Sequence, residues 1–241
     1  LNGYNDPRLP VYFQPVTEGD NKGEYRGVAN GMPNPQQEDY KAMSAPNVQE
    51  KSTDSPLRWM MASEVAFLRA EGAMRGWTAE MGGTAEEFYN KGIELSFLEN
   101  GLSADAAARY AADETSKPTD FTDVSAANTK YNISALGKIT IKWNAGASEE
   151  EQLERIITQK WIAMFPNGTE AWSEFRRTGY PLIFPVRSNY PTSGVDTNKQ
   201  IRRMVFPQSE YSNNGAAVQE AVKLLGGPDN GGTKLWWDKK N

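Results

Sequence analysis

The side chains best suited to recognising a ligand lie early in the chain, in a segment rich in glycine and proline. Its tyrosines offer flat aromatic faces, and a guanidinium and an amide between them offer planar polar groups. Sugar recognition uses this combination, because an aromatic face packs against the C–H face of a pyranose while polar groups bind its hydroxyls. The candidate ligand-binding residues are Tyr12, Tyr25, Arg26, Asn30 and Tyr40. The alternative left open is that these tyrosines only anchor a long loop by packing.

Catalytic chemistry has little support in the sequence. The chain contains no histidine and no cysteine, which removes the commonest general acid/base, thiol nucleophiles and every Ser–His or Cys–His arrangement. No Gly-x-Ser-x-Gly motif occurs, and in residues 227–234 a threonine precedes the lysine, the reverse of the P-loop order. A glycosidase needs two carboxylates in one cleft, and among 31 Asp and Glu residues some pair is always close. We therefore predict a protein that is not an enzyme and uses no cofactor.

Metal and nucleic-acid binding are also disfavoured. Four acidic residues could offer oxygen ligands to Ca²⁺, but their spacing does not match an EF-hand loop: Asp113, Glu114, Asp120 and Asp123. We interpret them as a solvated acidic stretch and predict no metal site. The formal net charge of -5 argues against a partner that binds through its phosphate backbone, which requires a basic surface.

The elements that must position these side chains are mainly helical. Apolar residues recur at helical spacing in two regions, each interrupted once by a glycine-containing turn, which predicts two αα-hairpins. The expected divisions are a loop-rich layer over 1–57, a first helix pair over 58–101, an irregular part over 102–147, and a second helix pair with a C-terminal helix over 148–241. The fold class is therefore mainly α, with tetratricopeptide-like αα-hairpins and long irregular loops.

Local patterns predict how these helices begin and which faces they bury. Capping boxes are expected where Thr84 is followed by Glu87 and where Ser148 is followed by Glu151. The expected inward stripes are Met61, Val65 and Leu68 in the first helix and Phe88, Gly92, Leu95 and Leu98 in the second. Trp161, Trp172 and Phe175 are expected in the core, and the last helix is expected from about Asn214 to Leu225.

Four motifs, two of which consist of two separate stretches, resemble those of the SusD/RagB proteins and occur in the family's order. The entry loop DPRL at 6–9 is similar to the family's D-P-R, and RWMMASEVAFLRAE at 58–71 resembles its a-E-v-x-F-L-r-A-E-A helix. The pair QKWIA at 159–163 and AWSEFRRTGYP at 171–181 resembles Q-K-W … W-x-E-x-R-R-T-G-Y-P. RRMVFP at 202–207 and WWD at 236–238 resemble R-R-x-x-Y-P … W-W-D, with Phe206 in place of the tyrosine. We interpret the charged residues of these motifs as scaffold.

The resemblance implies a SusD-like α/α superhelix that binds a nutrient without altering it. It also implies a lipid-anchored protein on the bacterial outer-membrane surface, a glycan or oligosaccharide ligand, and a SusC-like TonB-dependent transporter as partner. Because the family is longer than this chain, the resemblance implies that this is the C-terminal portion. The N-terminal half with its lipid anchor, the only membrane contact expected, would then be missing.

Three alternatives stay open at this point. The chain could be a helical interaction module that contacts the transporter and leaves ligand binding to the N-terminal half. It could bind an oligopeptide rather than a glycan. A hydrolase would require turnover that depends on one Asp or Glu.

Overall fold

The computed structural model describes residues 1–31, 40, 43–47, 58–186 and 194–239, and all structural statements below refer to these ranges. The α-helices are α1 (Leu9–Tyr12), α3 (Ala62–Met74), α4 (Thr78–Met81), α5 (Ala85–Glu99), α6 (Ala104–Ala111), α7 (Glu149–Ala163), α8 (Gly168–Thr178) and α9 (Gln208–Leu225). Two 3-10 helices span Asn2–Tyr4 and Ala126–Tyr131. In these ranges β pairing is limited to two isolated bridges, Phe13 with Pro46 and Phe121 with Ile133. The predicted mainly α architecture with long irregular connections is confirmed.

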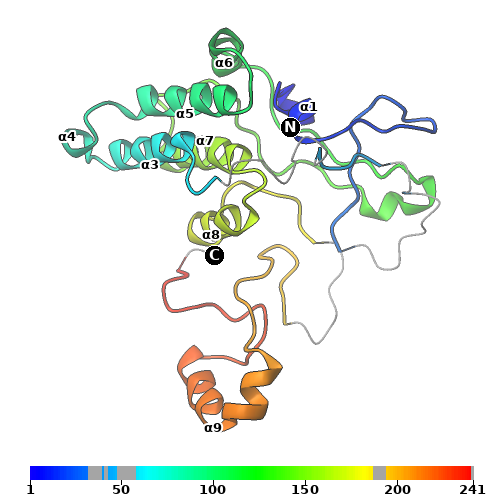
Figure 1. Cartoon of the computed structure of the whole chain (residues 1–241), viewed down its shortest axis with the longest axis vertical. Helices are drawn as coiled ribbons and strands as arrows, with labels where there is room; N and C mark the ends of the chain where they lie inside the picture. Colours follow the sequence, from blue (N-terminus) through cyan, green and yellow to red (C-terminus); the bar gives the residue numbers. More distant parts are fainter. Residues whose placement is uncertain (32–39, 41–42, 48–57, 187–193, 240–241) are drawn as a thin grey trace.

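Helices α3, α5 and α7 pack together, and α6 covers α5 (Figure 1). The N-terminal layer, which includes α1, lies beside them, whereas α9 projects away from the other helices (Figure 1). Both capping boxes are present, because Thr84 and Ser148 each accept a hydrogen bond from the backbone N–H three residues later. No helix in the described ranges is both long enough and apolar enough to cross a membrane.

The predicted inward faces of α3 and α5 are wrong by about one residue. In α3, Phe67 and Ala70 are fully buried, whereas Val65 and Leu68 are each 40% exposed. In α5 the buried side chains are Tyr89, Ile93 and Phe97 rather than Phe88, Leu95 and Leu98. The physical reason is that α3 packs against both α5 and α7, so apolar residues surround it and no single stripe marks its buried side.

Gly92 was predicted on the inward side of α5, and the structure shows why a small residue is needed there. A Cβ at this position would lie 2.6 Å from Cε1 of Phe67, closer than atoms can approach. The absence of a side chain lets α3 and α5 approach closely around the Phe67 ring. The last helix also differs from its prediction, because it begins at Gln208, bends at Asn214 and buries only Val218.

Charged residues of the motifs over 58–71, 171–181, 202–207 and 236–238 pair with residues far away in the sequence, as predicted for a scaffold. Both terminal nitrogens of Arg177 on α8 donate to Glu71 of α3, at 2.7 and 2.6 Å. Near the C-terminus Arg202 forms a buried ion pair with Asp238, 2.6 Å between the closest atoms. The guanidinium of Arg176 stacks 3.6 Å from the ring centroid of Trp172. The last part of the chain is held against α8 by Arg176 and Arg202, each of which donates from its guanidinium to the backbone carbonyl of the other, at 3.0 and 2.8 Å.

Candidate ligand-binding pocket

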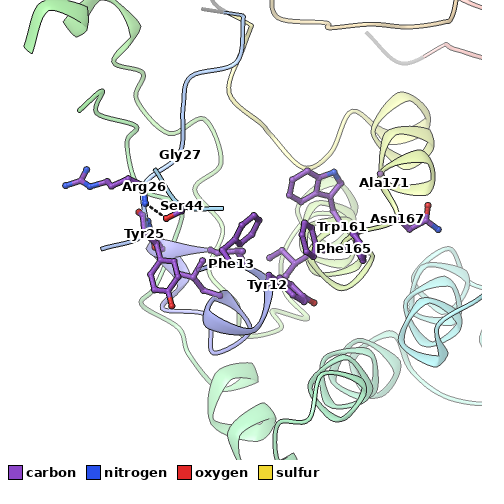
Figure 2. Close-up of a pocket in the computed structure, with 16 residues that line it drawn as sticks. Tyr12, Phe13, Tyr25, Arg26, Gly27, Ser44, Trp161, Phe165, Asn167 and Ala171 are labelled. Carbon is purple, nitrogen blue, oxygen red and sulfur yellow. Dashed lines mark hydrogen bonds between the residues drawn. The ribbon is translucent and has the colours of Figure 1, made fainter. Parts of the chain in front are cut away.

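The N-terminal layer and the α7–α8 turn enclose a pocket of about 560 Å³ (Figure 2). This volume lies within the range of roughly 300–1,000 Å³ that is typical of small-molecule sites. One wall comes from the segment around α1, from residues 25–27 and from Ser44. The other wall comes from the end of α7, the turn at 165–167 and the start of α8.

Aromatic rings form the inner surface where the two walls meet. The Phe165 ring centroid lies 4.8 Å from that of Tyr12 and 5.0 Å from that of Phe13, with tilted planes. Phe165 follows the end of α7, while Tyr12 ends α1 and Phe13 is its C-cap residue. Trp161 of α7 also lines the pocket and is 39% exposed. The pocket therefore offers flat apolar surfaces contributed by both walls.

The predicted ligand-binding residues divide into two groups. Tyr12, Tyr25 and Arg26 line the pocket, although Figure 2 shows the Arg26 guanidinium pointing away from the aromatic rings, where its Nε donates to Glu24 at 2.7 Å. Asn30 is exposed and lies outside the lining. Tyr40 also lies outside the lining, and its hydroxyl donates to Oδ1 of Asp123 at 3.0 Å.

Three pocket aromatics were missed as candidates, namely Phe13, Trp161 and Phe165. Trp161 was expected in the core, and this expectation is wrong, because neighbouring residues of α7 fill the interior and turn its indole towards the pocket. The sequence contained one indication of this position. The residues Pro166-Asn167-Gly168 interrupt the helical pattern soon after Trp161, so this tryptophan lies near the end of its helix. Trp172 is only half-buried, whereas Phe175 is buried as predicted.

The wall that carries Tyr12 and Phe13 is held in place by a buried ion pair. Arg8, the N-cap residue of α1, is fully buried. Its guanidinium donates to both carboxylate oxygens of Asp6, at 3.0 and 2.7 Å. It also donates to Ser96 of α5 and to Gln159 of α7, each at 2.9 Å. One side chain thus ties α1 to both core helices.

This anchor predicts a specific dependence of stability on pH. Burial alone would raise the pKa of Asp6, but the charge and hydrogen bonds of Arg8 and the hydroxyl of Tyr110 hold it below its ordinary 3.8. A lowered pKa adds stability that is fully present above 3.8 and is lost as pH falls through the folded-state pKa. Urea unfolding of the wild type and of Asp6→Asn should therefore show a stability gap at neutral pH that shrinks below 3.8. A gap that stayed constant into acid would contradict this account.

The four acidic residues considered as calcium ligands make other contacts within the protein. In the part of the chain that the structure describes, no group of three or more Asp or Glu residues gathers in a way that could hold an ion. The Asp113 carboxylate instead accepts hydrogen bonds from the backbone of Thr115 and Ser116, at 2.8 and 2.9 Å. The Asp123 carboxylate accepts a hydrogen bond from the Tyr40 hydroxyl.

Comparisons with known proteins place this geometry in context. The family described as Susd and RagB outer membrane lipoprotein matches residues 1–238, while no curated protein matches the chain. A chitin-binding SusD homologue from Flavobacterium johnsoniae is 43% identical with a TM-score of 0.90, covering 100% of this chain and 48% of that one. A SusD-like protein from Bacteroides thetaiotaomicron is 45% identical with a TM-score of 0.89, covering 100% and 49%. The chain thus spans about half the length of these structures.

Proposed function

Because the chain belongs to the SusD-like family of outer-membrane lipoproteins, we propose that it binds a glycan nutrient at the bacterial surface and releases it unaltered. The pocket between α1 and the α7–α8 turn is the proposed site, and its paired aromatic walls are the observation that carries this proposal. Tyr25, Phe13, Trp161 and Phe165 would present their faces or edges to sugar rings, while Tyr12 is buried and supports the Phe165 ring from below. The chitin-binding homologue supports a carbohydrate ligand.

Delivery to a SusC-like TonB-dependent transporter completes the proposal. Capture and release would depend on a difference in ligand affinity between two conformations of the protein, and would require no bond to be made or broken. This agrees with a chain that lacks histidine and cysteine. The alternative is that this chain serves only as scaffold and transporter contact. The relatives, which are about twice as long, give that alternative its support, since their additional half could hold the ligand.

A binding screen of the full-length protein against polysaccharides and peptides separates these possibilities. We expect a glycan to bind, and Tyr25→Ala to weaken its affinity about five- to tenfold, because an aromatic face of the pocket is lost. Tyr40→Phe is the matched control, since Tyr40 lies outside the pocket lining, and its affinity should match the wild type. Melting temperatures monitor folding. A glycan whose affinity is the same in Tyr25→Ala would move the site away from this pocket, and binding of peptides alone would replace the glycan.

A further inference from the structure

One side of α3 carries apolar side chains that the described part of the chain leaves partly uncovered. Val65 and Leu68 are each 40% exposed, and Met61 at the N-cap is half-buried. Residues three or four apart are neighbours on a helix surface, so these three form one strip along α3. Phe67 and Ala70, each two residues further on, lie about 200° around the helix and face the core. The strip is therefore a second apolar side of α3, distinct from its buried side.

A matching strip lies on α5 and faces the same way. The Arg69 guanidinium of α3 stacks 4.0 Å from the ring centroid of Phe88, so the side of α3 next to Leu68 adjoins the side of α5 that carries Phe88. Leu95 comes seven residues after Phe88, about two helical turns, and lies on that same side. Leu98 follows one turn later and is 48% exposed. The outer face, as we call this surface, consists of Met61, Val65, Leu68, Leu95 and Leu98.

One end of the outer face already receives an apolar contact from another helix. Met81 of α4 lies against Gly72 of α3, and its Sδ is 2.8 Å from the place where a Cβ on this glycine would be. The missing side chain leaves room for Met81 on the same side of α3 as Leu68, which is four residues earlier. The strip thus accepts helix packing where a helix is present, whereas Val65, Leu68 and Leu98 remain exposed.

An apolar outer face differs from what the end of a helical stack requires. In stacked helix pairs each pair buries apolar surface against its neighbours, and a pair at the end of the stack needs a polar outer side to stay soluble. The α3–α5 pair packs against α7, which makes it a member of such a stack. Its outer face is apolar rather than polar, so a further helical element is expected to cover it.

We propose that the outer face packs against helices of the N-terminal half of the full-length protein. Two observations favour this occupant over a separate protein. The face extends the stack of α3, α5 and α7, whose members all belong to one chain. The solved relatives also contain about as many residues again as this chain, which covers 48% and 49% of their lengths. The outer face shares no residue with the ligand pocket, so this inference does not rest on the proposed glycan binding.

Cysteine labelling of the full-length protein tests whether the outer face is covered. Residues 1–241 contain no cysteine, so Leu68→Cys places a single thiol in this part of the protein. Mass spectrometry of the peptide that carries it gives the rate of alkylation by iodoacetamide. This rate should be at least about 100-fold slower in the folded protein than in urea, because a covered thiol reacts only after local opening. Val28→Cys is the matched control, since Val28 is 44% exposed and lies outside the face. Its rate should fall less than about tenfold.

The outcomes separate the possible occupants of the face. Protection of Leu68→Cys that is unchanged on dilution supports packing by the N-terminal half. Protection that is lost on dilution would assign the face to a second copy of the protein, and a rate as fast as that of Val28→Cys would leave the face uncovered. Either of these results overturns the inference. Val65→Cys is the second probe if Leu68→Cys melts below the wild type. None of these results depends on the glycan screen.

Discussion

Replacing Arg8 with methionine is expected to lower the free energy of unfolding by about 3–5 kcal/mol, the cost of breaking a buried ion pair from one side. The substitution leaves the Asp6 carboxylate buried without its cation, and removes the donors to Ser96 and Gln159. It also removes a guanidinium that lies 5.0 Å from the ring centroid of Phe97. Urea unfolding followed by circular dichroism measures the change. Ligand affinity should fall as well, because α1 carries the Tyr12 wall.

Arg26→Ala is the matched control for this prediction. Arg26 also pairs with a carboxylate two residues away, Glu24, but both side chains are partly exposed, so its loss should cost less than about 1 kcal/mol. The double variant Asp6→Asn/Arg8→Met removes the unpaired charge and should recover part of the lost stability. If Arg8→Met cost no more than Arg26→Ala, the anchoring role of the pair would be disproved.

Features that depend on neighbours in sequence could be predicted from the sequence. Thr84 with Glu87 and Ser148 with Glu151 are three residues apart, so each capping box is complete within one helical turn. The helices of the two predicted pairs followed from the same local patterns, whereas α6 lies in the part over 102–147 that was predicted to be irregular. The buried side of α3 did not, because a helix enclosed by two neighbours carries apolar residues around most of its circumference.

The pocket could be predicted only in part, because its walls come from distant parts of the chain. Tyr12 and Tyr25 were found because they share one segment, whereas their partners lie far along the sequence, Trp161 on α7 and Phe165 just after its end. Tyr40 belongs to the same segment as Tyr12, yet its hydroxyl bonds to Asp123, 83 residues away. Proximity in sequence therefore grouped residues that the fold separates, and no local pattern indicates which tyrosine faces the pocket.

Trp161→Ala is expected to weaken glycan binding about 30-fold, because truncating a central aromatic of an interface typically costs about 2 kcal/mol or more. Trp161 is a large flat side chain at the pocket wall, and it is 39% exposed. Partial exposure means that the substitution removes less packing than loss of a core residue would. The variant should therefore stay folded, with a melting temperature close to that of the wild type.

Titration calorimetry of wild type, Trp161→Ala and Trp77→Ala with a glycan identified in the screen tests the central claim most directly. Trp77 is 57% exposed and lies outside the pocket lining, so it controls for the general loss of a surface tryptophan. The account predicts an affinity about 30-fold lower in Trp161→Ala and unchanged in Trp77→Ala. Equal affinities in all three folded proteins would contradict it, and would place the ligand outside the pocket between α1 and the α7–α8 turn.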